Sequence, residues 1–268
     1  MIMQSIEKLI DIMRALRDPK SGCPWDLEQD FQSLIPYTLE EAYEVADAIE
    51  RNNLNDIKSE LGDLLFQIIF YSQLAKEQEV FDFNDIAQAV SEKLIRRHPH
   101  VFADAKVKNA KEQTKEWEKI KKHEREEKAG KDSTHLSILD DVSRILPSLM
   151  RSEKLQRRAA KEGFDWPNIE DVMLKVREEL DEVQQEIDAD VQNKERIEDE
   201  IGDLFFSCIN LSRHADVDTE QCLRKANLKF ERRFRKLEQI ANRRGSQINE
   251  MTTNELENLW KEVKLQEK

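Results

Sequence analysis

The chain repeats one sequence plan, and this repeat restricts its fold more than any other feature. Four landmarks of the first half return in the same order, 138 to 143 residues later. They are the stretches 22–25 and 163–166, 40–45 and 178–183, 60–64 and 200–204, and the residues Trp117 and Trp260. Ordered recurrence at a nearly constant distance indicates a duplicated domain. We therefore predict domains over residues 1–126 and 136–268, joined by a linker over residues 127–135.

The composition favours helices throughout. The chain has six glycines and six prolines in 268 residues, well below the typical shares of about 7% and about 5%. Apolar residues recur at helical spacing, for example over residues 5–17. Thr38 and Glu41 have the spacing of a capping box, so we expect a helix from about residue 39 to 49, ended by Asn52 and Asn53. The predicted fold class is all-α, with one helical bundle in each domain.

The chain carries a net charge of −13, which argues against nucleic acid or an anionic membrane as its main partner. Local basic clusters still allow a nucleotide. Its three cysteines form no Cys-x-x-Cys pair, so we expect reduced thiols in a cytoplasmic protein. Residues 1–17 lack the apolar centre of a signal peptide, and no apolar run approaches the ~20 residues of a membrane span.

Each half places acidic residues at helical spacing on two successive predicted helices. Glu-Glu-x-x-Glu on the first is followed by Glu-x-x-Asp in an apolar run on the second. The carboxylates concerned are Glu41, Glu44, Glu60 and Asp63 in the first half and Glu179, Glu182, Glu200 and Asp203 in the second. Residues three apart share a helix face, so antiparallel packing would gather four inward-facing carboxylates. Such a group requires a cation, and an all-oxygen set selects Mg²⁺, with Mn²⁺ as a substitute.

Other interpretations of these acidic residues exist. They could serve only in salt bridges between paired helices, with no metal. A di-iron carboxylate site requires Glu-x-x-His, and none of the five histidines has a glutamate three residues before it. Gly62 and Gly202 lie inside the apolar helices at a cost of ~1 kcal/mol each against alanine, which close approach of two helices would explain.

The second half also carries cations that suit a phosphate chain. Lys175 and Arg196 each lie one turn before a candidate ligand, and the stretch 224–233 is strongly basic. Lysine and arginine bind phosphate, and a tryptophan face suits a base. The predicted nucleotide-binding residues are Lys175, Arg196, Lys225, Asn227, Lys229, Trp260 and Lys264. In the first half Tyr37 replaces Lys175 and Asp56 replaces Arg196, so we expect the second half to be the working nucleotide site.

Several stretches resemble the signature of the MazG family of nucleoside triphosphate pyrophosphohydrolases, namely EEAYEV, ELGDLLF, EELDEV, EIGDLFF, GCPWD, RRHPHVF, GFDW and KANLKFERRF. The resemblance covers nearly the whole chain. It implies tandem four-helix-bundle domains, a homodimer, and Mg²⁺-dependent cleavage of NTPs and dNTPs between the α- and β-phosphates. The implied products are NMP and pyrophosphate, in nucleotide-pool house-cleaning or regulation.

The resemblance also implies roles for particular residues. The implied metal ligands are Glu179, Glu182, Glu200 and Asp203. The implied nucleotide contacts are Lys175, residues 196–199, residues 225–229 and Trp260. Apart from residues 197–199, 226 and 228, these roles fall on residues that are already predicted above as ligands or nucleotide contacts.

The predicted mechanism is metal-assisted hydrolysis, with direct attack of water on the α-phosphate. Glu178 or Glu179 could orient or deprotonate that water. The predicted catalytic set is Glu178, Glu179, Glu182, Glu200 and Asp203. Functions of two other classes stay open: a nucleotide-sensing module with slow turnover, and a helical dimer that scaffolds a partner. The scaffold predicts no rise in melting temperature with Mg²⁺, whereas a ligand that binds only the folded state must raise it.

Overall fold

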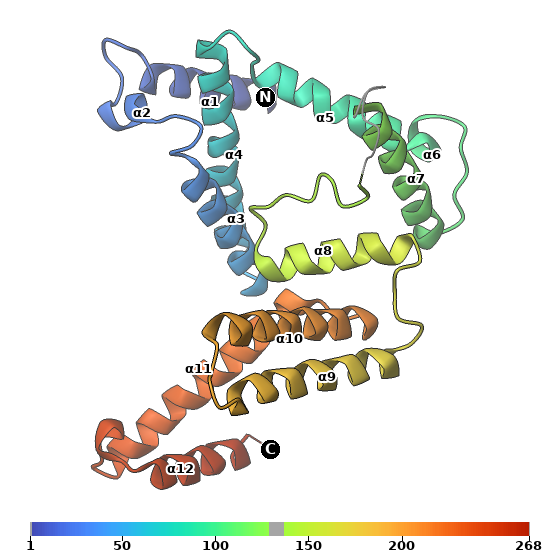
Figure 1. Ribbon diagram of the computed structural model, residues 1–268. Coiled ribbons are helices and arrows are strands. Elements are labelled where there is room, and N and C mark those ends of the chain that lie inside the picture. Colours follow the sequence, from blue (N-terminus) through green and yellow to red (C-terminus); the bar gives the residue numbers. More distant parts are fainter. Residues whose placement is uncertain (1, 129–136, 268) are drawn as a thin grey trace. The chain divides into compact units, whose positions relative to one another are not determined.

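The computed structural model describes residues 2–128 and 137–267. In these ranges every regular element is a helix (Figure 1), so the predicted all-α class is confirmed. The chain divides into two compact units, Met1–Lys128 and Ala129–Lys268. The predicted linker over 127–135 lies outside the described residues, apart from residues 127 and 128, which end a helix of the first unit. No helix in the described ranges is long and apolar enough to cross a membrane.

The first unit is organised around a helical hairpin. Its helices are α1 Ile2–Leu16, α2 Pro24–Glu28, α3 Ile35–Glu50, α4 Leu54–Glu77, α5 Phe83–Arg97, α6 Pro99–Phe102 and α7 Ala110–Lys128. α3 and α4 lie side by side (Figure 1) and are joined by residues 51–53. Asn52 turns the chain with a positive φ of 53°, a conformation that asparagine tolerates. The side chain of Asn53 caps α4, so the predicted break at this asparagine pair is confirmed.

α3 begins earlier than the sequence pattern predicts, at Ile35. Pro36 lies in its first turn, where the fixed φ of proline suits a helix and the missing N–H leaves no bond unmade. Thr38 therefore lies inside the helix. Its hydroxyl donates to the Leu34 carbonyl at 3.1 Å and lies 2.9 Å from the Tyr71 hydroxyl. The predicted capping box at Thr38 is wrong because the helix has already started at the proline.

The core of the first unit lies where α4 packs against α1. Its side chains, each at most 4% exposed, are Met13, Leu34, Ile69, Phe70 and Leu74. The Phe70 ring meets the rings of Trp25 and Phe66 edge-on, at centre distances of 6.5 and 5.9 Å. The Arg17 guanidinium lies 5.5 Å from the centre of the same ring. This packing fixes α4, and with it the acidic residues that α4 carries.

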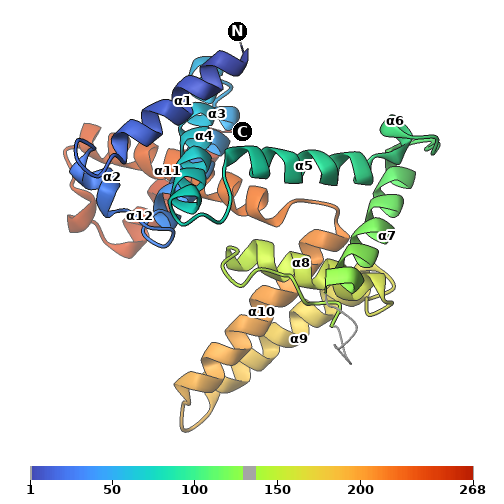
Figure 2. The ribbon, with the colours of Figure 1, turned by 90° about the horizontal axis from the view of Figure 1, so that it is seen from above.

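The second unit contains a corresponding hairpin. Its helices are α8 Ser148–Lys161, α9 Ile169–Asp188, α10 Lys194–His214, α11 Thr219–Arg243, the 3₁₀ turn η1 Ile248–Glu250, and α12 Thr253–Leu265. α9 and α10 lie side by side in both views (Figures 1 and 2), and α8 packs on α10 and α11. The Gln156 side chain of α8 donates to the Phe206 carbonyl of α10 at 2.8 Å. The repeated sequence plan therefore folds into a repeated α-hairpin.

α11 and α12 form a second hairpin at the end of the chain (Figure 1). Gly245 follows the end of α11 with a φ of +72°, the left-handed position that commonly ends a helix. Thr252 and Glu255 cap α12 through a reciprocal capping box. The side chains buried between the two helices are Leu237, Ala241, Leu259 and Val263.

Asp165 connects the loop before α9 to the end of α10. The Arg213 guanidinium donates two hydrogen bonds to its carboxylate, one of them 2.9 Å long, and the His214 Nε2 lies 2.9 Å from it. The hydrogen bonds from Arg213 outweigh the opposing effect of burial and lower the pKa of Asp165 to about 2. A lowered pKa stabilises the fold above the unfolded-state value of about 4, and this stabilisation is lost as the pH falls towards 2.

The Asp165→Asn variant is expected to melt several degrees lower than the parent chain at pH 7, because Arg213 keeps its charge and loses its partner. The two melting temperatures should converge as the pH falls from about 4 to about 2, since unfolding takes up a proton on the parent carboxylate in this range and the stabilisation by its charge is progressively lost. Circular dichroism melts across this pH range measure both effects. Asp190→Asn, in the exposed loop before α10, is the matched control and should leave the melting temperature unchanged. A constant gap between the curves at every pH would contradict the prediction.

Candidate metal and nucleotide site

The α9–α10 hairpin brings three predicted ligands together. One carboxylate oxygen from each of Glu179, Glu182 and Glu200 lies within 4.8 Å of the others. Glu179 is only 4% exposed, because it lies on the helix face that also buries Val172 and Val183. We call these three residues the unit 2 cluster. Their role as metal ligands stays a prediction.

The α3–α4 hairpin forms the same arrangement in the first unit. Oxygens of Glu41, Glu44 and Glu60 also lie within 4.8 Å of one another, and we call these residues the unit 1 cluster. Glu41 and Glu60 are half-buried and Glu44 is exposed. The same residue spacing on two successive helices thus produces the same acidic cluster twice.

Asp63 and Asp203 do not join the clusters. Both side chains are exposed, and neither belongs to the group of oxygens within 4.8 Å. The burial expected for these two aspartates is therefore not found, because the helix surface around them is uncovered within the unit, as the exposed neighbours Leu61 and Phe205 show. Asp63 still lies close enough to Glu41 and Glu60 to raise their pKa values, and the role of both aspartates as ligands stays a prediction.

Gly62 and Gly202 also differ from expectation. Outside the backbone of its own helix, nothing lies within 4 Å of the position where a Cβ would stand on either residue. Among the described residues of each unit, no second helix approaches these glycines closely. Each glycine lowers helix stability by ~1 kcal/mol relative to alanine, and no contact among the described residues offsets this loss.

Electrostatic repulsion acts in both clusters. In the unit 2 cluster, burial and then the neighbouring Glu179 raise the pKa of Glu182, and Lys175 opposes this shift. In the unit 1 cluster, burial and then Asp63 raise the pKa of Glu41, and burial and then Glu44 raise that of Glu60. Burial and the neighbouring negative charges thus destabilise the ionised carboxylates, and a shared cation would stabilise them. An all-oxygen donor set of this kind fits a hard divalent ion.

Lys175 is the cation that the structure places at the unit 2 cluster. Its Nζ lies 2.7 Å from Glu178 Oε1 and 2.8 Å from Glu179 Oε1. Hydrogen bonds to Glu178 and then Glu179 raise the pKa of this ammonium. In the first unit Tyr37 takes the corresponding position, and its ring lies edge-on to Trp25 at 5.5 Å. The two clusters therefore differ in whether a lysine accompanies them.

Arg196, at the start of α10, does not contact the cluster. Its guanidinium lies 2.5 Å from a carboxylate oxygen of Glu186, on α9. The corresponding residue of the first unit, Asp56, pairs with Arg51 at 2.6 Å. Both positions thus link the two helices of a hairpin near their turn, with the signs of the charges reversed.

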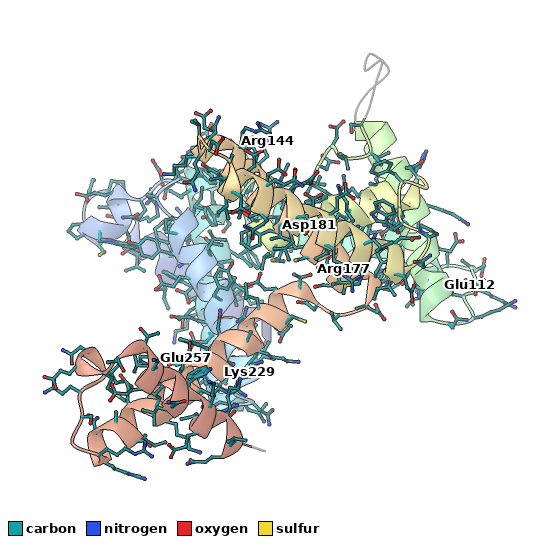
Figure 3. All side chains as sticks on the ribbon, turned by 60° about the horizontal axis from the view of Figure 1, so that its bottom comes forward. Glu112, Arg144, Arg177, Asp181, Lys229 and Glu257 are labelled. Atoms are coloured by element: carbon teal, nitrogen blue, oxygen red, sulfur yellow. The ribbon has the colours of Figure 1, made fainter. Side chains whose placement is uncertain are left out.

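The other predicted nucleotide residues lie on α11 and α12. Lys225 and Lys229 line a hollow of about 410 Å³ together with Cys222 and Arg232, and Asn227 is exposed on the same helix. Figure 3 labels Lys229 on α11 and Glu257 on α12. No described contact joins these residues to the carboxylates of the unit 2 cluster.

Trp260 and Lys264 line an apolar groove of about 490 Å³ between α11 and α12. Phe230 and Phe234 form one wall, and the Phe230 ring lies 5.6 Å from that of Trp260. Sequence reasoning missed these two phenylalanines, which lie one turn apart in a basic stretch. Their spacing of four residues is the signal that could have revealed them, because it places both rings on one helix face.

Comparison with known proteins shows which family the chain is similar to. The model of the MazG nucleotide pyrophosphohydrolase domain matches residues 29–102 and 168–237, each of which contains one acidic cluster. A nucleoside triphosphate pyrophosphohydrolase of Escherichia coli is 50% identical over 99% of this chain and 99% of its own. A nucleoside triphosphate pyrophosphohydrolase/pyrophosphatase MazG of Thermotoga maritima is 39% identical over 96% of this chain and 95% of its own.

A solved structure also matches. The crystal structure of a mazG-related protein from Thermotoga maritima is 31% identical, with 43% of this chain and 98% of that chain covered. Its TM-score of 0.37 is too low to carry an argument about the fold. The full-length relatives and the doubly matched domain settle the family: the chain belongs to the MazG family of nucleotide pyrophosphohydrolases.

Proposed function

We propose that the protein hydrolyses nucleoside triphosphates, both NTP and dNTP, between the α- and β-phosphates, to NMP and pyrophosphate. The observation that carries this proposal is the unit 2 cluster, three carboxylates within 4.8 Å of one another with Lys175 beside them. The names of the full-length relatives point to the same reaction. The cellular role would be house-cleaning or regulation of the nucleotide pool.

The proposed cofactor is Mg²⁺, with Mn²⁺ as a substitute. In the second unit Glu179, Glu182, Glu200 and Asp203 would hold it, and in the first unit Glu41, Glu44, Glu60 and Asp63 would form a second site. When bound, such an ion lowers the pKa of water and neutralises charge on phosphate oxygens. The exposed aspartates lie one turn from a cluster member, at a spacing that shares its helix face.

Residues of this chain would position the triphosphate. We assign phosphate contacts to Lys175, Arg196, Lys225, Asn227, Lys229 and Lys264, and base stacking to Trp260. Lysine and arginine suit phosphate oxygens, and the groove lined by Trp260 and Phe230 is apolar enough for a base. Glu178, which is exposed beside Lys175, or Glu179 would take the proton of the attacking water.

The second unit is the proposed working site. Its cluster carries Lys175, whereas Tyr37 and Asp56 stand at the corresponding positions of Lys175 and Arg196 in the first unit. We propose the domain limits 1–126 and 136–268, joined by residues 127–135, in line with the two compact units.

The products identify the bond that is cleaved. With ATP and Mg²⁺, chromatography should show AMP and pyrophosphate in equal amounts, and excess EDTA should abolish both. In ¹⁸O-labelled water the label should appear in AMP, because direct attack at the α-phosphorus transfers water oxygen to that group. Formation of ADP and phosphate, or label found only in pyrophosphate, would overturn the proposal.

We further propose a homodimer. Large apolar side chains are exposed along the hairpin of the second unit, among them Leu174, Leu180, Phe205 and Phe206. Exposed apolar patches of this kind commonly mark protein interfaces. Gly202 lies on α10 with open space at its Cβ position, which allows a partner helix to approach closely. Sedimentation equilibrium should give about twice the chain mass of 31.6 kDa, and a mass of one chain would refute the dimer.

The charge of the chain and its proposed substrate indicate which other partners and which location to expect. A net charge of −13 disfavours nucleic acid and anionic membranes, so we propose neither as a partner. A nucleoside triphosphate substrate suits a protein of the cytoplasm, which is the location we propose.

A further inference from the structure

We propose that Lys175 is a built-in competitor of the metal ion, so that the second unit binds its metal tightly only together with the triphosphate, whereas the first unit binds metal tightly without it. This inference rests on the function proposed above and concerns the regulation of the same site. It makes Lys175 a residue with two successive partners: the glutamates first and the substrate afterwards.

The first step of the argument is where the ammonium lies. Lys175 Nζ is 2.8 Å from Glu179 Oε1, and Glu179 is the most deeply buried member of the unit 2 cluster. The same Nζ is 2.7 Å from Glu178 Oε1. An ammonium at hydrogen-bond distance thus already neutralises the carboxylate that a metal ion would bind. A divalent ion arriving at Glu179 would meet a positive charge a few ångströms away, and like charges repel strongly in a partly buried site.

The second step is that Lys175 can leave. Its side chain is 31% exposed and ends a flexible four-carbon stem, so the ammonium can swing outwards without unfolding α9. In water alone that movement would leave the ammonium without its two carboxylate partners. A bound triphosphate supplies phosphate oxygens as new partners for the ammonium. Metal and nucleotide therefore both favour the conformation in which Lys175 has left Glu178 and Glu179, and each strengthens the binding of the other. Such coupling is reciprocal, and typical couplings change affinity by about 5- to 150-fold.

The third step is the comparison within the chain. Tyr37 stands at the position of Lys175, and its ring packs edge-on against Trp25 at 5.5 Å. Among the described contacts, no lysine or arginine pairs with Glu41, Glu44 or Glu60. The unit 1 cluster therefore has the same three carboxylates and lacks the competing cation. A free divalent ion meets no positive charge there that must first be displaced.

The decisive experiment measures binding of Mn²⁺ to the full-length chain by the loss of the free-ion signal in electron paramagnetic resonance. Glu44→Gln with Glu60→Gln removes binding by the first unit. In this background the parent second unit should bind Mn²⁺ weakly alone. With α,β-methylene-ATP it should bind at least about tenfold more tightly, after subtraction of the Mn²⁺ that the analogue binds without protein. Adding Lys175→Met should tighten binding of Mn²⁺ alone by about tenfold and shrink the effect of the nucleotide analogue.

Arg177→Met is the matched control. Arg177 is an exposed residue of the same helix (Figure 3), and its loss changes the net charge equally. It has no described contact with Glu178 or Glu179, so affinity for Mn²⁺ should stay at the parent value. If Arg177→Met strengthens binding as much as Lys175→Met, a general charge effect explains the result and the inference is wrong.

A reciprocal exchange covers the case in which Lys175→Met fails to fold. In a chain whose second unit is silenced by Glu182→Gln with Glu200→Gln, Tyr37→Lys should weaken binding of Mn²⁺ alone by about tenfold. The half-exposed Tyr37 position can hold a lysine. Unchanged affinity in both the Lys175→Met and Tyr37→Lys chains would overturn the inference. If instead the proposed function is wrong, Mn²⁺ and the nucleotide analogue would not bind together at the second unit in any of these variants.

Discussion

In the Glu182→Ala variant, kcat/KM for release of pyrophosphate from ATP falls by at least about 100-fold. Loss of a residue that only hydrogen-bonds to a metal ligand commonly lowers activity by about 10- to 100-fold, and loss of a ligand itself should cost at least as much. Glu182 shares the unit 2 cluster with Glu179 and Glu200. Removing its carboxylate leaves two of the three clustered oxygens to hold a divalent ion. A coupled pyrophosphate assay with saturating and subsaturating ATP measures both kcat and KM.

The matched change in the first unit is Glu44→Ala. Glu44 holds the corresponding place in the unit 1 cluster, so the substitution removes the same group from the same spacing. Because Tyr37 and Asp56 replace the cations of the second unit there, kcat/KM should change by less than about threefold. If Glu182→Ala keeps full activity and Glu44→Ala loses it, the working site lies in the first unit. Equal losses of activity in both variants would mean that hydrolysis requires both sites.

The largest effect on stability is expected for Phe70→Ala, at about 3–5 kcal/mol of unfolding free energy for the first unit. Phe70 is fully buried in the core where α1 and α4 meet, and it contacts the rings of Trp25 and Phe66. Truncation removes the apolar area and leaves a cavity that the surrounding helices fill only in part. Urea unfolding followed by circular dichroism measures the loss, with separate fits if the two units unfold in separate transitions.

Val80→Ala is the control for this measurement. Val80 follows α4 with most of its side chain exposed, and its truncation should change the free energy of unfolding by no more than about 0.5 kcal/mol. A loss below about 1 kcal/mol in Phe70→Ala would show that this ring does not hold α4 in place.

Much of the fold follows from local sequence. Helical spacing and the scarcity of glycine and proline predict the helices, and the asparagines at 52 and 53 predict the turn between α3 and α4. The start of α3 did not follow from the capping pattern. Pro36 competes with Thr38 as a helix start, and a buried Leu34 favours the earlier one. That competition is decided by tertiary packing, which a capping pattern does not contain.

The candidate site was likewise predictable from the sequence only in part. Residues three apart on a helix must share a face, and Glu179, Glu182 and Glu200 do come together. The exposure of Asp203 was not predictable from its apolar neighbours, because an apolar run has the same sequence pattern whether its own chain or a second chain covers it. The ion pair of Arg196 with Glu186 was also missed, because it depends on how closely two helix ends approach.

All three glutamates of the unit 2 cluster come from one hairpin, between residues 179 and 200. The donor set is therefore local in sequence and of low contact order, and formation of one pair of neighbouring helices is enough to assemble it. A genetic duplication of such a segment copies a whole donor set at once. If Lys175 competes with the metal ion as proposed, one substitution at the position shared by Lys175 and Tyr37 would then make the two copies differ in metal binding.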